Sequence, residues 1–261
     1  MRHMDEKPAT AAARAAYVTL ALFLATALAP ALAAPAGAAP LQRVDSGEPL
    51  RPHLLLIHGG AFLGDDPTFE PLTLGPAVSA GFEPHYLHYP LGDLPGAVRA
   101  ARAEARRLQA RFGEAVYAYG SSAGGTLAAI LAGDGLVSAA VAKAPPSDLV
   151  TWHWPVAALG EDYHQRIRAN PGVLRRLSPL RRPARRPLLV VHGARDQVVP
   201  HAMSEAFAAK FPRVHLWTVP GGHWTERLRP HILTRSLEWL KRRADSIQPS
   251  RRRGRGAAPA S

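Results

Sequence analysis

Short apolar runs alternate with longer segments of helical spacing between residues 53 and 244. Runs of about four to eight apolar residues bounded by glycine or proline are typical of buried strands, whereas apolar residues that recur every three or four positions indicate helices. The pattern predicts strands at His53–Gly60, Phe82–Pro90, Ala115–Gly120, Leu136–Pro145, Arg186–Gly193 and Arg213–His223. It predicts helices at Leu94–Phe112, Ala123–Gly133, His201–Phe211 and Pro230–Ala244.

The alternation of strands and helices indicates the fold class. Strands that are apolar throughout favour a mostly parallel sheet with helices on both faces. We therefore predict an α/β fold with a doubly wound sheet of about six strands. In such sheets ligands bind beyond the carboxyl ends of the strands. The candidate site should lie in the loops that follow Ile57, Tyr119, Val191 and Val219.

The loop after Tyr119 reads GSSAG, from Gly120 to Gly124, and matches the pattern Gly-x-Ser-x-Gly. A predicted strand precedes it and a predicted helix follows, which is the context that a nucleophilic serine on a sharp turn requires. The register of the pattern assigns the nucleophile to Ser122 and leaves Ser121 at the variable position. The alternative is an ordinary helix start, where small residues serve packing.

A serine hydroxyl is a poor nucleophile near neutral pH and needs a base that an acid orients. Asp196 lies in the loop after the strand LLVVHG, and His223 follows two glycines after the last strand. Each has a structural alternative, since Asp196 would also suit a helix cap and we expect other histidines, such as His58 and His192, to hold loops. Together, in the order Ser122, Asp196, His223, they predict a catalytic triad.

The glycine-rich loop HGGAF follows the first predicted strand. Acyl transfer develops negative charge on a substrate oxygen, and backbone N–H groups must already face that oxygen. We predict the donors to be Gly60 and Ala61 from this loop and Ala123, the residue after the nucleophile. A plain tight turn is the alternative, but the position of the loop relative to Ser122 favours the oxyanion hole.

These residues resemble those of α/β-hydrolases. The segments HGGAF, GSSAG, SPL and LLVVHGARDQVVP, together with HYPLGDLPGAVRAA, are similar to motifs of hormone-sensitive-lipase-like carboxylesterases and, more distantly, of prolyl-oligopeptidase-type hydrolase domains. The resemblance covers about residues 50–244. It implies an α/β-hydrolase fold with a small cap and an acyl pocket near Phe62. The chain departs from the usual run of three glycines at Ala61, which still supplies an N–H.

The sequence and the resemblance together give the expected domain organisation. We expect a signal peptide and linker at 1–38, the hydrolase domain at 39–247 and a basic disordered tail at 248–261. A cap insertion is expected at about 148–186. Within it, Trp152 and Trp154 would either line the substrate pocket or pack the cap on the core.

Charge and cysteine content restrict the partners. The chain has a formal net charge of +12 and no cysteine, which excludes disulfides and cysteine-ligated metals. Much of the charge lies in paired arginines at 175–186 and in the C-terminal tail. The tail has no aromatic residues on which bases would stack, so nucleic acid is not an expected partner. Weak contact between the tail and an anionic surface is the remaining expectation.

The N-terminus predicts export. Basic residues precede an apolar run from Ala15 to Ala34 that Pro30 interrupts. Small residues at 31–33 and 36–38 have the spacing of a signal-peptidase site. We expect a periplasmic or secreted protein after cleavage, with an uncleaved membrane anchor as the alternative.

The function predicted from the sequence is a serine hydrolase that cleaves small-molecule carboxylic esters through an acyl-enzyme. Such a mechanism needs no metal and no organic cofactor. Two alternatives remain open. One is a peptidase or amidase of the prolyl-oligopeptidase type, and the other is a binding protein that keeps the fold without catalysis.

Overall fold

The structure is a computed structural model that describes residues 51–254 apart from 113–114, 153–162 and 226–228. The compact unit that holds these residues begins at Arg51. The predicted signal peptide and linker, and Trp154, lie outside the described residues, so the statements about them stay predictions. Among the described helices, none is long and apolar enough to cross a membrane.

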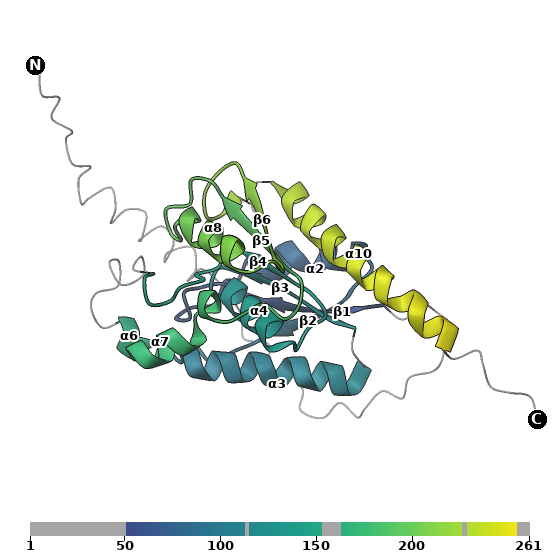
Figure 1. The fold of residues 1–261 in the computed structure, drawn as a ribbon, viewed down its shortest axis with the longest axis horizontal. Coiled ribbons are helices and arrows are strands. Elements are labelled where there is room, and N and C mark those ends of the chain that lie inside the picture. The colour runs from purple at the N-terminus through teal and green to yellow at the C-terminus, as the bar shows by residue number, and fades with distance from the viewer. Residues whose placement is uncertain (1–50, 113–114, 153–162, 226–228, 255–261) are drawn as a thin grey trace, which may run out of the picture. The chain divides into compact units, whose positions relative to one another are not determined.

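In the part of the chain that the structure describes, six parallel strands form one sheet (Figure 1). The strands are β1 (His53–Ile57), β2 (Glu83–Leu87), β3 (Val116–Ser121), β4 (Ala140–Lys143), β5 (Leu188–Gly193) and β6 (Val214–Val219). Their order is β2-β1-β3-β4-β5-β6. The chain therefore moves outward in opposite directions from β1 and from β3, and the carboxyl ends of these two strands form the switch point where ligands bind in such sheets.

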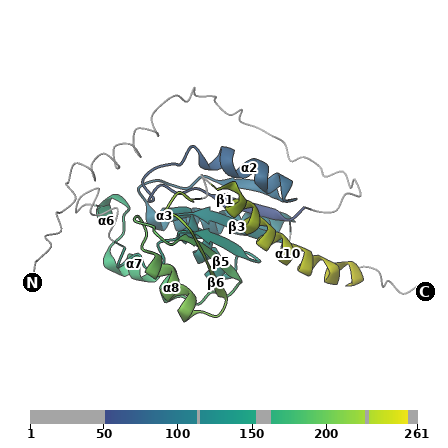
Figure 2. The ribbon, with the colours of Figure 1, turned by 90° about the horizontal axis from the view of Figure 1, so that it is seen from above.

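Helices cover both faces of the sheet. The helices α3 (Leu94–Phe112), α4 (Ala123–Asp134) and α8 (His201–Lys210) pack on one face, and α2 (Phe69–Ser79) and α10 (Pro230–Gly254) pack on the other. Figure 2 shows α2 and α8 on opposite sides of the sheet. Leu55 and Ile57 belong to one apolar cluster and Leu54 and Leu56 to the other, because successive side chains of a strand point to opposite faces. All four are fully buried, which stabilises the fold by about 1.5–3 kcal/mol each.

The predicted α/β-hydrolase fold is confirmed, and the predicted helix Leu94–Phe112 has the same bounds as α3. The helix α2 was not predicted. The sequence of α2, FEPLTLGPAVS, contains two prolines and a glycine, which are typical of turns. It is helical because Phe69, Thr73 and Ala77 are buried on one side, beneath α10 and against the sheet.

The C-terminal helix also differs from its prediction. We expected it to end at Ala244 and the segment 248–261 to be disordered. Instead α10 continues to Gly254. The domain boundary at residue 248 stays a prediction. Apolar periodicity ends near Ala244 and the continuation is rich in arginine, so the sequence pattern did not indicate that the helix continues.

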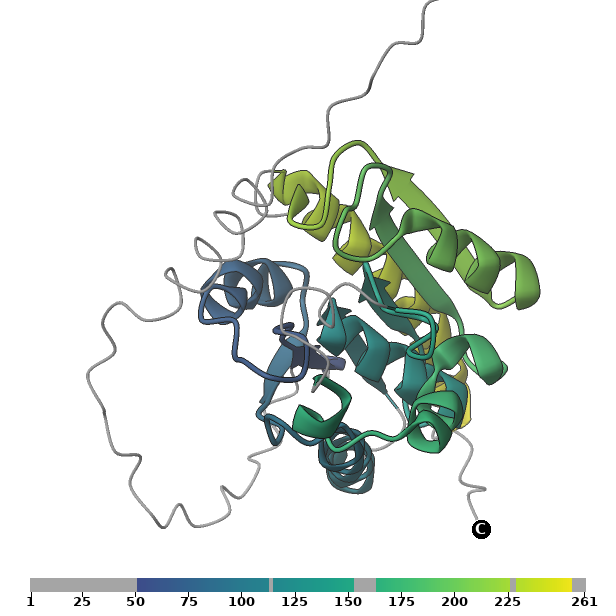
Figure 3. The same ribbon diagram turned by 90° about the vertical axis from the view of Figure 1, so that its left-hand side faces the viewer.

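The described part of the expected cap insertion is helical. It holds α6 (Tyr163–Arg166), α7 (Pro171–Leu177) and the 3-10 helix η1 (Pro179–Arg181). Figure 3 views the molecule from the side on which α6 and α7 lie. Asn170 caps α7, since its side-chain oxygen accepts the N–H of Val173 at 2.9 Å. Ser178 anchors η1, because its hydroxyl lies 2.7 Å from the carbonyl oxygen of Leu174 and is fully buried.

Candidate active site

Ser122 occupies a strained turn between β3 and α4. Its φ and ψ are 54° and −117°, a backbone conformation that residues other than glycine rarely adopt. The flanking glycines explain how the turn closes: a methyl group on Gly120 would overlap the carbonyl of Gly124, and one on Gly124 would overlap the carbonyls of Ile57 and His58. The turn is therefore packed directly against the end of β1, and the half-buried Ser122 projects from the switch point.

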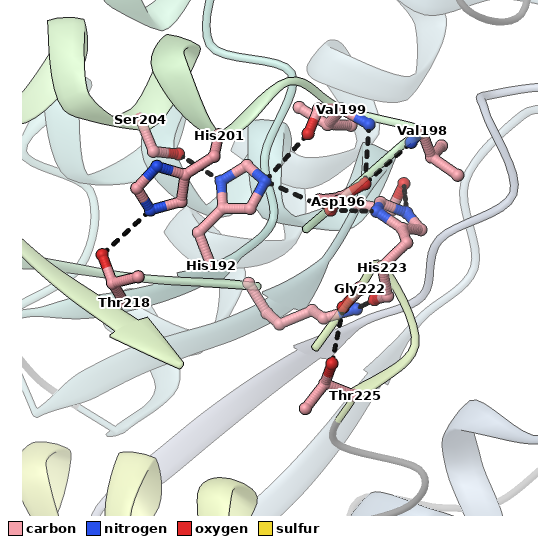
Figure 4. A network of polar contacts seen from close by, with 12 residues as sticks. His192, Asp196, Val198, Val199, His201, Ser204, Thr218, Gly222, His223 and Thr225 are labelled. Atoms are coloured by element: carbon pink, nitrogen blue, oxygen red, sulfur yellow. Dashed lines mark hydrogen bonds and ion pairs between the residues drawn. The ribbon is translucent and has the colours of Figure 1, made fainter. Parts of the chain in front are cut away.

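His223 and Asp196 complete a chain of hydrogen bonds that begins at Ser122. Nε2 of His223 lies 3.0 Å from Oγ of Ser122, and Nδ1 of His223 lies 2.7 Å from Oδ2 of Asp196. Figure 4 shows His223 and Asp196 in contact. The three residues follow β3, β5 and β6, so the parallel sheet brings together side chains that are far apart in sequence. The structure thus places all three predicted triad residues within hydrogen-bonding distance.

Asp196 is held as a carboxylate. Its Oδ1 accepts the N–H groups of Val198 and Val199 at 2.8 and 2.9 Å, and its Oδ2 faces His223 and, at 3.1 Å, Nε2 of His192. Burial alone would raise the pKa of Asp196. The hydrogen bonds from His192 and His223, the charge of a protonated His223 and the N–H of Val199 outweigh burial and hold the pKa well below its usual range.

An ionised Asp196 has two consequences. Because Oδ2 only accepts hydrogen bonds, Nδ1 of His223 carries the hydrogen and Nε2 is free to accept the proton of Ser122. The carboxylate also links stability to pH. Its contribution is complete above the pKa of an unfolded aspartate, about 3.9, and is lost as the pH falls toward the lower pKa of the folded chain.

The predicted oxyanion loop lies beside the nucleophile. A methyl group on Gly59 would sit 3.3 Å from Cβ of Ser122. The loop then turns, with φ of 102° at Gly60 and 54° at Ala61, and the carbonyl of Gly60 accepts the N–H of Leu63 at 2.9 Å. Ala61 adopts the left-handed conformation although it replaces a glycine of the usual run. As the first residue of α4, Ala123 has an N–H that the helix itself does not use.

Tyr89 holds this loop in place through its hydroxyl and its ring. Its hydroxyl donates to the carbonyl oxygens of His58 and Gly59, at 3.1 and 2.9 Å. Its ring stacks on His58 with centroids 4.2 Å apart. Burial lowers the pKa of His58 despite the nearby carboxylate of Asp65, so the stacked ring is neutral at pH 7. His58 therefore holds the loop, as the sequence analysis expected.

Two of the predicted pocket residues, Phe62 and Trp152, are buried. Phe62 is fully buried in the apolar cluster beneath α3 and α4. Trp152 is 2% exposed, and its Nε1–H donates to the carbonyl of Val198 at 3.0 Å. Of the two roles considered for Trp152, packing on the core is the one that these contacts describe. The exposed aromatic ring beside the site is Trp224, whose ring meets that of His223 edge-on at 5.3 Å.

Lys143, which the sequence analysis did not single out, joins the two halves of the site. Its carbonyl accepts the N–H of Ser122 at 2.8 Å, and its Nζ donates to the carbonyl of His223. The side chain is only 3% exposed. A lysine at the end of the apolar strand AVAK is the one sequence signal, because lysine is seldom buried without a partner.

A serine, histidine and aspartate linked in this order at the switch point of a parallel sheet define the α/β-hydrolase class. A sequence model of the prolyl oligopeptidase family matches residues 93–246, which is more than half of the chain. The chain therefore belongs to the prolyl oligopeptidase family. Ser122, Asp196 and His223 lie within the matched residues, whereas the loop of Gly60 and Ala61 precedes them.

Solved structures of other hydrolases share the fold. A sugar hydrolase from Lactococcus lactis is 16% identical with a TM-score of 0.64, and the match covers 76% of this chain and 91% of that one. A truncated carbohydrate esterase from gut microbiota is 15% identical with a TM-score of 0.63, covering 75% and 86%. A hormone-sensitive lipase from a metagenome library is 17% identical with a TM-score of 0.62, covering 74% and 76%. A search of curated proteins finds no significant match.

Proposed function

We propose that this protein is a serine hydrolase that cleaves carboxylic esters of small molecules. The observation that carries the proposal is the hydrogen-bond chain from Oγ of Ser122 through His223 to Oδ2 of Asp196. A serine held in a strained turn, with a base and a buried carboxylate in line, is arranged for nucleophilic attack on an acyl carbon.

In the proposed mechanism, Nε2 of His223 takes the proton of Ser122 while Oγ bonds to the ester carbonyl carbon. The N–H groups of Gly60, Ala61 and Ala123 stabilise the negative oxygen. His223 then returns the proton to the departing alcohol, which leaves an acyl-enzyme. Water, activated by the same histidine, cleaves the acyl group from Ser122, and Asp196 stabilises the charged imidazole in both steps.

We favour ester hydrolysis over peptide hydrolysis as the proposed function because similar folds occur in a carbohydrate esterase and a hormone-sensitive lipase. The family to which the chain belongs is named for peptidases and supports the amidase alternative. The two substrates differ chemically in the leaving group, since an amine must be protonated before it departs and an alcohol departs more readily.

A substrate panel tests the proposal. Purified protein should hydrolyse p-nitrophenyl acetate or butyrate with a kcat/KM at least about 100-fold above that for matched p-nitroanilides of short peptides. A fluorophosphonate probe should label the wild type and not Ser122→Ala. Faster turnover of the anilides would favour the peptidase alternative. If the probe labels a control esterase but not the wild-type protein, the assignment of any serine hydrolase activity to this protein would be contradicted.

Lys143→Met tests whether the buried lysine holds the base in place. The substitution removes the donor to the carbonyl of His223, and an unsatisfied buried carbonyl costs about 1–3 kcal/mol. We expect kcat on p-nitrophenyl acetate to fall about 10-fold and Tm to fall by about 2–8 °C. Lys210→Met, at the exposed end of α8, is the matched control and should change neither quantity. Wild-type kcat in a folded Lys143→Met protein would show that His223 is placed without this lysine.

A further inference from the structure

His192 is fully buried near the end of β5, and both of its ring nitrogens have partners. Nδ1 lies 2.6 Å from Oγ of Ser204 on α8. Nε2 lies 3.1 Å from Oδ2 of Asp196 and 3.0 Å from the carbonyl oxygen of Val199. Figure 4 shows the His192 ring between Ser204 on one side and Asp196 on the other.

These partners determine the tautomer of His192. Both groups that face Nε2, a carboxylate and a carbonyl, can only accept hydrogen bonds, so Nε2 carries the hydrogen. Nδ1 is then the acceptor, and the hydroxyl of Ser204 donates to it. The ring is thus anchored to α8 through Nδ1, and the Nε2–H faces both the carbonyl oxygen of Val199 and Oδ2 of Asp196.

Asp196 consequently receives donors on both of its oxygens. The backbone N–H groups of Val198 and Val199 hold Oδ1, while His192 and His223 converge on Oδ2. We propose that His192 is a positioning residue, which holds Oδ2 of Asp196 in line with His223 and takes up part of the negative charge of that oxygen. This inference rests on the proposed function and adds a residue to its machinery that makes no contact with the reacting serine.

The other ionisable groups around His192 act elsewhere. The ring of His201 meets the ring of His192 edge-on, with centroids 5.3 Å apart. However, Nε2 of His201 is hydrogen-bonded to Oγ1 of Thr218 at 2.9 Å, and its Nδ1 lies 3.3 Å from Oε1 of Glu205. Lys143, on the neighbouring strand β4, donates to the backbone of His223. Among the described residues, Asp196 is the carboxylate that faces the His192 ring.

Removal of the His192 donor has two expected effects on catalysis. Asp196 is held less firmly, so kcat should fall about 10-fold, the change expected for one hydrogen bond to a charged group. More negative charge then remains on Oδ2, which favours the protonated form of His223. The acidic limb of the profile of kcat/KM against pH should therefore move to higher pH by about half a pH unit. KM should stay the same, because His192 does not face the substrate.

His192→Asn and His192→Gln form a matched pair that isolates this hydrogen bond. The amide of asparagine reaches about as far as Nδ1 of histidine and keeps a partner for Ser204, but it falls short of Asp196. The amide of glutamine reaches about as far as Nε2, so it donates to Asp196 and loses Ser204. We expect His192→Asn to show the lower kcat and the shifted limb. His192→Gln should stay within about 3-fold of the wild type with an unshifted limb.

His201→Gln, on the same helix as Ser204, is the control and should leave both kcat and the profile unchanged. Equal losses of kcat in the Asn and Gln variants, with no shift of the limb, would overturn the proposal and assign His192 a structural role. ¹⁵N NMR of the wild type provides a test that needs no variant, because a hydrogen on Nδ1 of His192 would also overturn it. Absence of hydrolysis in the wild type would refute the proposed function, and the NMR result would still decide the hydrogen bond.

Discussion

Ser122→Ala is expected to lower kcat/KM on p-nitrophenyl acetate by about 10⁴–10⁶-fold. The substitution removes the oxygen that His223 faces at 3.0 Å and leaves the rest of the site in place. Residual activity would come from the oxyanion donors and from substrate binding alone. The protein should keep its fold, because the strained backbone at φ 54° is held by the glycines around it and not by the serine hydroxyl.

The neighbouring serine supplies the control for this prediction. Ser121 is the last residue of β3, and its side chain is buried on the sheet, whereas Ser122 is the serine that faces Nε2 of His223. Ser121→Ala should therefore keep kcat/KM within about 5-fold of the wild type. Mass spectrometry after fluorophosphonate labelling should place the adduct on Ser122. An adduct on Ser121, or full activity in Ser122→Ala, would contradict the assigned nucleophile.

Asp196→Asn should have the second largest effect, a fall in kcat of about 10³–10⁴-fold. An asparagine at this position has one acceptor end and one donor end, whereas all the groups around Asp196 are donors. If its oxygen faces Val198 and Val199, its NH₂ faces His223. That orientation makes Nδ1 of His223 the acceptor and puts the hydrogen on Nε2, which then cannot take the proton of Ser122.

The opposite orientation of the asparagine is no better for the protein. Its NH₂ would then face the N–H groups of Val198 and Val199, two buried donors that lose their acceptor. We expect the resulting fall in the free energy of unfolding to be about 1–3 kcal/mol. Urea unfolding measures this change and steady-state kinetics measures kcat.

Asp134→Asn is the matched control for the loss of a carboxylate. Asp134 ends α4 and pairs with Arg102 at 2.7 Å and with Arg182, outside the triad network. It should leave kcat within about 2-fold of the wild type. A kcat in Asp196→Asn that matches this control would show that the acid of the triad lies elsewhere.

Local patterns were sufficient to predict Ser122 and the helix α3. The turn needs glycines at 120 and 124 because of clashes within a few residues, and α3 has its amphipathic pattern in one continuous segment. Asp196 and His223 were also predicted, since parallel strands deliver the loops at their carboxyl ends to one edge of the sheet. Each of these features depends on chain order and local sterics, which a sequence contains.

The remaining features depend on contacts between distant segments. The helix α2 forms despite its prolines because Phe69 is buried against other elements, and the buried state of Trp152 depends on Val198. Lys143 belongs to no motif, and its role arises from the placement of β4 beside the loop of His223. His192 lies within the motif LLVVHGARDQVVP, but the motif does not show which groups its ring contacts. The sequence by itself determined the fold class and the three triad candidates. Only the tertiary structure decided what holds them, because the hydrogen bonds of individual side chains depend on atomic positions that a residue pattern does not specify.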